Sequence, residues 1–348
     1  MARVKLGQTG IEVSDYCLGT MTYGTQTPEA DAHRQIDTAL EAGIDFLDTA
    51  EMYPVNPVSK DTVGGTETII GNWNARSGRR SDIVIATKHS GANGGFVREG
   101  RGIFADTVRD AVEQSLRRLQ TDYIDLYQFH WPNRGSYHFR QNWGFDPSGQ
   151  PAASEILENM ASVMAVLKAL VEEGKIRSFG LSNDSAWGTM GWLSAAGAIG
   201  GPRVATIQNE YSLLCRLYDT DLGELTYHEN ITLLAFSPLA TGFLTGKYQG
   251  GKIPAGSRMN FQPEMGGRLS DRTLDVSQFY LDIASKHGVD PTHMALAWTR
   301  TRPFQTIPIF GATTQEQLEH IIAGWDVELS DGLLDEVSKA HRANPMPY

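Results

Sequence analysis

A repeated alternation of short apolar segments with longer amphipathic ones constrains the fold of this chain more than any other feature. Eight short segments, from DYCLGT at 15–20 to QTIPIFG at 305–311, are each followed by a segment with helical periodicity. The short segments are mixed apolar rather than strictly alternating, which is typical of strands buried on both faces. Strands that alternate with helices form parallel sheets through right-handed crossovers. The sequence therefore predicts an α/β protein with a parallel sheet.

Eight strand–helix units predict a (β/α)8 TIM barrel that spans residues 1–348 as a single domain. The segment VKLGQTGIEVS before the first unit predicts an N-terminal β-hairpin that turns at Gln8, Thr9 and Gly10. A doubly wound open sheet is the alternative fold. However, no G-x-G-x-x-G follows the first strand, and GANGG at 91–95 opens no immediate helix. We therefore favour the barrel.

Two of the predicted loops are longer than the loops of compact domains usually are. Residues 131–153, after the fourth strand, are rich in aromatic residues, and residues 246–271, after the seventh strand, are rich in Gly and Pro. Long loops of this kind tend to be functional. We expect the aromatic side chains of the first loop to form walls of a substrate pocket. They are Trp131, Tyr137, Phe139, Trp143 and Phe145.

The charge balance and the cysteines exclude several classes of partner. The chain has 30 Lys and Arg against 41 Asp and Glu, a net charge of −11, and no basic run that would suit nucleic acid. No apolar run is long enough to span a membrane, and the N-terminus has no apolar signal core. Cys17 and Cys215 have neither metal-binding nor redox spacing. We therefore expect a cytoplasmic protein with reduced thiols and no nucleic-acid or membrane partner.

Polar residues end several of the predicted strands, and in a barrel of this type active sites lie at the C-terminal ends of the strands. The second strand ends at Asp48, the third at Lys88 and the fourth at His130. Because buried charges are costly unless they are paired, we expect Asp48 and Lys88 to form an ion pair across adjacent strands. Polar residues also end the fifth and sixth strands. They are Ser182, Asn183 and Gln208.

Tyr53 follows Asp48 by five residues and completes a set of groups that can transfer a proton. A free phenol has a pKa of about 10, and we expect the Lys88 cation to lower that pKa by roughly 1–3 units. Tyr53 would then protonate a developing alkoxide that His130 orients. The histidines show no H-x-H or H-E-x-x-H spacing, so we predict no metal site. With no nucleophile and no metal, the electrons must come from a hydride cofactor.

Four motifs identify a resemblance to a known family. GIDFLDTAEMY is similar to G-x-x-x-x-D-T-A-x-x-Y, and GKIRSFGLSN is similar to G-K-x-R-x-x-G-x-S-N, while IVIATKH and DYIDLYQFHWP match two further strands. With these motifs the chain resembles the aldo-keto reductase superfamily over nearly its whole length. Within it, the chain looks most like the bacterial Tas-like enzymes and the related potassium-channel β subunits. The resemblance implies a catalytic tetrad of Asp48, Tyr53, Lys88 and His130.

The resemblance also implies a bound NADP(H). Ser182, Asn183 and Gln208 match positions that hydrogen-bond the nicotinamide carboxamide. In AFSPLATGFLTGKY, Phe236 matches a residue that stacks on the nicotinamide. In the later segment SRM, Arg258 matches an arginine near the adenosine 2′-phosphate. The further positions implied to contact the cofactor are Thr20, Met21, Asp48, Ser237, Pro238, Leu239, Gly242, Lys247, Gly311, Thr313 and Gln317.

Two departures from the family pattern lie near the adenosine end. Ile309 and Phe310 stand where the family often has a single proline, and Ile321 stands where an asparagine usually contacts adenine. The implied preference for NADP over NAD therefore rests largely on Arg258 and Thr313.

The implied function is the reversible, NADPH-dependent reduction of an aldehyde or ketone to an alcohol, with hydride from the nicotinamide and the proton from Tyr53. An NADP-binding regulatory subunit with little turnover is the alternative that the channel-subunit resemblance permits. A third alternative is another barrel enzyme, such as an isomerase or hydrolase. The expected partner is a small carbonyl or alcohol substrate, and a homo-oligomer is compatible with the sequence.

Overall fold

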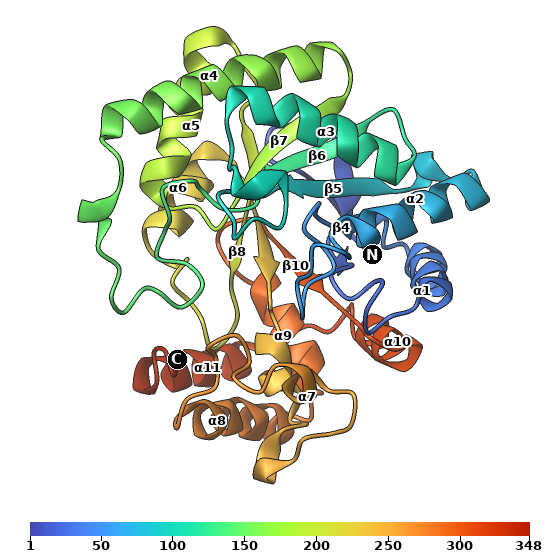
Figure 1. The fold of residues 1–348 in the computed structure, drawn as a ribbon. Helices are drawn as coiled ribbons and strands as arrows, with labels where there is room; N and C mark the ends of the chain where they lie inside the picture. The colour runs from blue at the N-terminus through green and yellow to red at the C-terminus, as the bar shows by residue number, and fades with distance from the viewer.

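Eight parallel strands close into a barrel, and the helices pack around it (Figure 1). The computed structural model describes all residues from 1 to 348. The barrel strands are β3 (Cys17–Gly19), β4 (Phe46–Asp48), β5 (Val84–His89), β6 (Ile124–Phe129), β7 (Ile176–Ser182), β8 (Val204–Glu210), β9 (Thr232–Phe236) and β10 (Thr306–Phe310). Consecutive strands pair in parallel, and β10 returns to pair with β3. The closed barrel confirms the predicted fold and excludes the open sheet.

Each barrel strand is followed by a helix, as the periodicity predicts. These helices are α1 (Glu29–Glu41), α2 (Gly65–Ser77), α3 (Ala105–Leu119), α4 (Ala153–Glu172), α5 (Ala186–Ile199), α6 (Asp221–Glu229), α8 (Thr273–Lys286) and α10 (Gln315–Ala323). In α3, buried Val108, Val112 and Leu116 recur every fourth residue and place one apolar stripe against the barrel. The same spacing rule explains why the sequence pattern locates these helices.

Three helices lie outside the predicted strand–helix units. They are α7 (Arg258–Phe261), α9 (Pro291–Arg300) and α11 (Asp331–Ala343). Both longer ones carry a start signal in the sequence. Asp290 accepts hydrogen bonds from the backbone N–H groups of Thr292 and His293 and precedes a proline at the first helical position. Ser330 caps α11 in the same way through Leu333.

The N-terminal hairpin covers the end of the barrel where the strands begin. Strands β1 (Arg3–Lys5) and β2 (Glu12–Ser14) pair antiparallel, as predicted. Leu6 and Val13 are fully buried and belong to one cluster with Cys17 and Phe46, the first residues of β3 and β4. The long loops and the polar residues of the strand ends lie at the opposite end of the barrel.

The two long loops meet at the end of β8. Residues 130–152 connect β6 to α4, and residues 237–272 connect β9 to α8, a longer connection than the sequence predicts. Arg140 of the first loop and Arg268 of the second both donate hydrogen bonds to the buried Glu210 carboxylate, at 2.9 and 2.7 Å. These ion pairs fix the loops relative to each other. No helix of the chain has both the length and the apolar character needed to cross a membrane.

Candidate active site

Asp48 and Lys88 form a buried ion pair at the ends of β4 and β5. Asp48 lies opposite Ala86 in the sheet, and Lys88 points to the same face as Ala86 because side chains alternate along a strand. Lys88 Nζ donates to Asp48 Oδ2 at 2.6 Å and to the Thr49 carbonyl at 2.7 Å. Burial by itself lowers the pKa of Lys88, but the charge and hydrogen bond of Asp48 together with the neighbouring Tyr53 outweigh it, so the net pKa is raised. Lys88 is therefore a fixed, fully buried cation.

Two glutamine amides hold the second oxygen of the Asp48 carboxylate. Gln208 Nε2 donates to Asp48 Oδ1 at 2.7 Å, and Gln128 Nε2 donates to the same oxygen at 3.3 Å. A carboxylate only accepts hydrogen bonds, so both amides must turn their NH2 groups toward it. The sequence analysis missed Gln128, although it lies two residues before His130 on the same strand. Gln208 keeps its amide oxygen for a further donor.

Tyr53 lies against both His130 and Lys88. The ring centroids of Tyr53 and His130 are 5.7 Å apart at 78°, and Lys88 Nζ is 4.9 Å from the Tyr53 ring centroid. Burial raises the pKa of Tyr53 more than the Lys88 cation lowers it, and Asp48 raises it further, so the net pKa lies above the usual 10.0. The expected lowering of this pKa is therefore wrong for the protein alone. The phenol is a protonated donor at neutral pH.

His130 is a neutral imidazole at the end of β6. Burial and the neighbouring Lys88 cation hold its pKa well below the usual 6.5. Its Nδ1 is buried without a hydrogen-bond partner, and its ring packs on Trp131 with centroids 4.7 Å apart. The four residues predicted to form a tetrad therefore lie together. They combine one proton donor, one fixed cation with its counter-ion, and one neutral imidazole.

Ser182 and Asn183 lie beside this group and leave one polar atom unsatisfied. Ser182 Oγ donates to the Gln208 carbonyl at 2.8 Å, and Asn183 Nδ2 donates to the His130 carbonyl at 2.9 Å. Asn183 Oδ1 is buried and has no donor. Asn183 also has a left-handed backbone, with φ of 51°. A buried acceptor without a donor is costly, and a carboxamide NH2 group would satisfy it, so this corner fits a nicotinamide.

Thr20 and Met21 lie on the other side of Asp48. The Thr20 hydroxyl donates to the Asp48 carbonyl at 2.8 Å, and its side chain is fully buried. In the structure Thr20 therefore supports the end of β4. Met21 is half-buried and follows directly.

The connection after β9 carries cations that lack acidic partners. Arg258 donates only to the Gln262 side chain, at 3.2 Å, and pairs with no carboxylate. Burial, and then the charge of Arg268, lowers the pKa of Arg258 to about 10. Burial and the Arg258 charge likewise lower the pKa of Lys247. Two partly buried cations that repel each other fit an anion such as a phosphate.

The backbone of this connection is unusual close to Lys247. Ser237 and Gly242 have φ of 52° and 105°. A Cβ at Gly242 would lie 2.5 Å from the flexible end of Lys247, and the φ of 105° is one that residues with a side chain rarely adopt, so the backbone conformation favours glycine here. The other predicted contacts in this segment, Phe236, Pro238 and Leu239, lie three to six residues before Gly242. Strained backbone of this kind is common at ligand sites.

The start of α10 brings the remaining predicted cofactor residues together. The backbone N–H and the hydroxyl of Thr313 both donate to Gln317 Oε1, at 2.9 and 3.1 Å, and Gly311 lies just before them. Helix N-termini favour anions because their first N–H groups are free. Ile321 is buried in the core between α10 and the barrel. An apolar core residue therefore stands where the family usually has an asparagine that contacts adenine.

Comparison with known proteins assigns the family. The model of the aldo/keto reductase family matches residues 16–342. The chain belongs to this family. It is 41% identical over 346 residues to the protein tas of Escherichia coli K12, covering 99% of this chain and 98% of the relative. It is 29% identical over 366 residues to the NADH-specific methylglyoxal reductase of the same strain, covering 98% and 99%. It is also 29% identical over 353 residues to a probable voltage-gated potassium channel subunit beta of Arabidopsis thaliana, covering 98% and 96%.

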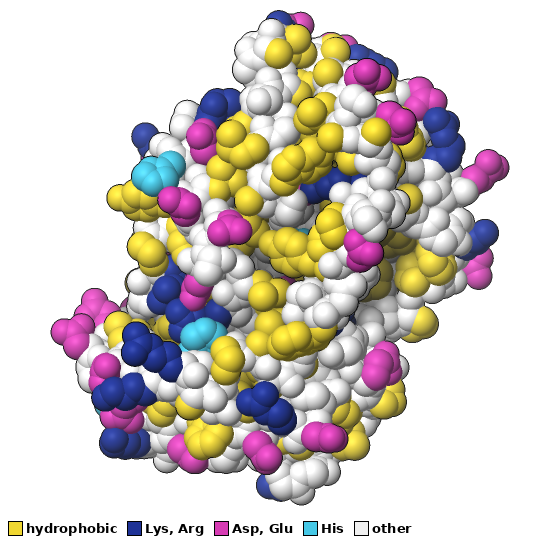
Figure 2. All heavy atoms as spheres, turned by 90° about the vertical axis from the view of Figure 1, so that its left-hand side faces the viewer, with side chains coloured by type: hydrophobic (Ala, Val, Ile, Leu, Met, Phe, Trp, Pro, Cys, Tyr) yellow, Lys and Arg dark blue, Asp and Glu magenta, His cyan; other side chains and the backbone are white.

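In this aldo-keto reductase, some of the aromatic residues predicted to form the substrate pocket pack near His130, while others are exposed to solvent. Trp131 packs on His130, donates its indole N–H to the Ala92 carbonyl at 2.9 Å and contacts Phe139 with ring centroids 6.2 Å apart. Trp143, in contrast, is 70% exposed to solvent. Figure 2 shows hydrophobic side chains spread over the middle of the face on which this loop lies. Trp131 and Phe139 are therefore the better placed of the predicted pocket residues.

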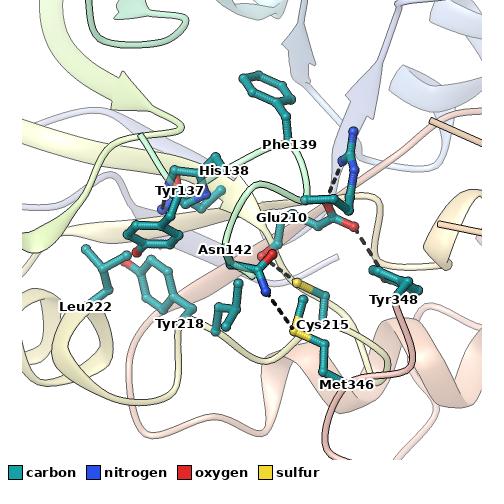
Figure 3. A pocket seen from close by; sticks show the side chains of 13 residues that line it. Tyr137, His138, Phe139, Asn142, Glu210, Cys215, Tyr218, Leu222, Met346 and Tyr348 are labelled. Carbon is teal, nitrogen blue, oxygen red and sulfur yellow. Dashed lines mark hydrogen bonds and ion pairs between the residues drawn. The ribbon is translucent and has the colours of Figure 1, made fainter. Parts of the chain in front are cut away.

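A small cavity lies between the first long loop, the end of β8 and the C-terminus (Figure 3). It encloses about 20 Å³, enough for roughly one water molecule. Tyr137, Glu210, Cys215 and Tyr348 are among its lining residues, and none of the four catalytic candidates is. The Tyr348 hydroxyl donates to Glu210 Oε1 at 3.3 Å, which ties the last residue to the two long loops.

The sequence analysis also missed a buried ion pair behind Tyr53. Glu51 is buried, accepts from the Ser90 backbone N–H at 2.6 Å and pairs with both terminal nitrogens of Arg98. Arg98 contacts His89 Nδ1 at 3.2 Å, and His89 follows Lys88 directly. The only signal in the sequence is the carboxylate two residues before Tyr53. The pair joins the segment that carries Tyr53 to the strand that carries Lys88.

Proposed function

We propose that this aldo-keto reductase reduces an aldehyde or a ketone to the corresponding alcohol with NADPH, in a reversible reaction. The observation that carries the proposal is the convergence of a protonated Tyr53, the Lys88 cation and the neutral His130. A bound NADPH supplies the hydride for the carbonyl carbon. The phenol of Tyr53 then supplies the proton for the carbonyl oxygen, so the product is the neutral alcohol.

Each of the other three residues has a supporting part in this proposal. Lys88 stabilises the phenolate that remains when Tyr53 gives up its proton. Asp48 keeps Lys88 charged in a site where burial favours the neutral amine. His130 is neutral, so it offers a hydrogen bond to the carbonyl oxygen without competing as an acid.

NADPH is proposed over NADH because of the unpaired charge in the connection after β9. Arg258 and Lys247 are partly buried and have no carboxylate partners, and Thr313 directly precedes the N-cap of α10. A relative of similar length is named for its specificity for NADH, so family membership alone does not decide between the two cofactors. The buried, unpaired Cys17 and Cys215 support a cytoplasmic location.

An activity screen tests the proposal. The purified protein is mixed with NADPH and a panel of aldehydes, ketones and sugars, and oxidation of the cofactor is followed together with alcohol formation. We expect turnover with at least one class of carbonyl compound and none from Lys88→Met. If the wild-type protein binds NADPH but oxidises it with no compound in the panel, a regulatory binding subunit becomes the better account.

A further inference from the structure

Two histidines and an aspartate converge outside the predicted active site. Asp290 caps α9, His293 lies in the first turn of that helix, and His320 lies in the second half of α10. One ligand atom from each residue lies within 4.8 Å of the other two. The two helices stand on either side of β10 in the chain. None of the three residues has a part in the chemistry proposed above.

The hydrogen bonding of His293 leaves one ring nitrogen bare. His293 Nε2 is 2.6 Å from the His320 backbone carbonyl, which only accepts, so Nε2 must carry a proton. In the neutral ring Nδ1 is therefore a free lone pair. This nitrogen is 3.9 Å from Asp290 Oδ1, beyond hydrogen-bonding distance. Histidines that bind metals usually donate the other N–H to a carbonyl or carboxylate, as His293 does.

The distance between His320 and Asp290 also suits a shared ion. His320 Nε2 is 3.3 Å from Asp290 Oδ2. Two ligands on a tetrahedral zinc ion with bonds of about 2.0–2.1 Å are roughly 3.3 Å apart. Asp290 Oδ1 accepts from the backbone N–H groups of Thr292 and His293, which holds the carboxylate in place. Its Oδ2 accepts no hydrogen bond and remains available.

Gly324 provides the space that the His293 ring occupies. A Cβ at Gly324 would lie 2.1 Å from His293 Cγ, and its backbone φ of −113° is one that other residues adopt. The glycine is therefore required by the close approach of the ring and not by backbone strain. The rings of His293 and His320 stack with centroids 4.7 Å apart at 27°, so the half-exposed His320 ring must turn to bring both in-plane lone pairs to one ion. Packing thus fixes the imidazole that carries the free lone pair.

We propose that Asp290, His293 and His320 bind one divalent transition-metal ion, with zinc the best match, and leave a fourth position for water. Two imidazoles and one carboxylate are a ligand set that zinc favours. The ion ties α9 to α10, the helix whose first turn carries Gln317 and which Thr313 directly precedes. Its part is therefore structural. The histidines are 27 residues apart on two helices, so no spacing motif could have indicated the site.

Zinc titration of the full-length, untagged protein tests this proposal. After treatment with a chelator, ZnCl2 is titrated by calorimetry, and thermal unfolding is followed with and without zinc. We expect one ion per chain and a higher midpoint of unfolding with zinc. His320→Ala is the informative variant because that side chain is half exposed and makes no hydrogen bond in the structure. We expect it to weaken binding by at least about tenfold, since loss of an outer-shell partner alone costs 10- to 100-fold.

Two further variants separate the site from general surface binding. Asp290→Asn keeps an oxygen to cap α9 but loses the charge, and should also weaken zinc binding. His287→Ala is the matched control, because His287 lies 3.3 Å from Glu336 but belongs to no group of three potential metal ligands, and it should bind as the wild type does. Absence of binding in the wild type would overturn the proposal. Equal affinity of wild type and His320→Ala, or an equal loss in His287→Ala, would overturn it as well.

Discussion

Burial and the charge of Lys88 shift the pKa of the Tyr53 phenol in opposite directions. Burial raises its pKa, and the Lys88 cation 4.9 Å from the ring lowers it by less. Asp48 adds to the raising effect because its charge opposes that of the phenolate. The sign of the shift matters for function, since a phenol with a raised pKa holds its proton through the whole physiological range. In the protein without a cofactor, Tyr53 therefore already carries the proton that carbonyl reduction requires.

The pH dependence of carbonyl reduction should follow from this sign. Below the raised pKa the phenol is protonated, so kcat should not fall from ionisation of Tyr53 until the pH exceeds about 10. His130 stays neutral across the same range because its pKa lies well below 6.5. The measurement is kcat against pH with a substrate that shows a deuterium isotope effect. A loss of rate with an apparent pKa of about 7 to 9, as Lys88 alone would produce, contradicts the account.

Arg258→Ala should separate the two nicotinamide cofactors. Charge-assisted contacts are worth about 1.5–3 kcal/mol, so loss of a 2′-phosphate contact should weaken NADPH binding by at least about tenfold at 1.4 kcal/mol per decade. NADH lacks that phosphate, so its affinity should change little. Fluorescence titration of both cofactors into wild type and variant gives the comparison. Equal losses would instead assign Arg258, which lies near Lys247, to the phosphates that both cofactors share.

At the scale of elements, the segment after β5 supports the loop that carries Tyr53 and the strand that carries Lys88. Arg98 reaches back from this segment to the buried Glu51, two residues before Tyr53. Arg98 and Glu99 both have left-handed backbones, with φ of 43° and 55°. The Glu51–Arg98 ion pair thus holds this strained segment against the loop that carries Tyr53. Loss of the arginine would leave Glu51 buried and unpaired.

Arg98→Gln should lower kcat and the free energy of unfolding together while the affinity for NADPH changes little. Breaking one partner of a buried ion pair costs about 3–5 kcal/mol, and the Tyr53 segment loses its anchor. Arg101→Ala is the matched control, since Arg101 lies in the same segment but its pair with Asp106 is exposed. It should behave like wild type. Unchanged kcat in Arg98→Gln at a temperature where it is folded would show that the pair has no positioning role.

The sequence predicts elements and strand ends well but not contacts between loops. Asp48, Lys88 and His130 could be placed because strand ends in a barrel meet on one side. Helix α9 was missed because it interrupts the expected alternation of one strand with one helix. The Glu51–Arg98 pair joins residues 47 positions apart through a segment without periodicity. The direction of the Tyr53 pKa shift could not be predicted from the sequence. Burial decides that direction, and burial depends on the packed structure.

At the scale of the whole molecule, the two ends of the barrel have separate tasks. The N-terminal hairpin packs Leu6 and Val13 against the first residues of the strands. The other end holds the ion pair, the phenol and the unpaired cations. Changes at the hairpin end should therefore affect stability and leave chemistry unchanged.

Leu6→Ala tests this separation. Removing a fully buried leucine costs about 2–5 kcal/mol of the free energy of unfolding, while kcat below the unfolding transition should equal that of wild type. Lys5→Ala is the control, because Lys5 is exposed on the same hairpin. Denaturant unfolding and steady-state kinetics provide both readouts. A large fall in kcat for folded Leu6→Ala would mean that the two ends of the barrel are coupled.

Single-turnover reduction by Tyr53→Phe tests the central claim most directly. The variant keeps the ring between Lys88 and His130 and removes only the hydroxyl that supplies the proton. NADPH affinity is measured by fluorescence, and hydride transfer is followed in one turnover with a carbonyl compound identified by the activity screen. The account predicts unchanged NADPH affinity and a rate lower by about 10²–10⁴-fold, the usual worth of general acid catalysis. A variant that keeps more than about half of the wild-type rate would contradict it, since general acid catalysis by Tyr53 could not then be limiting.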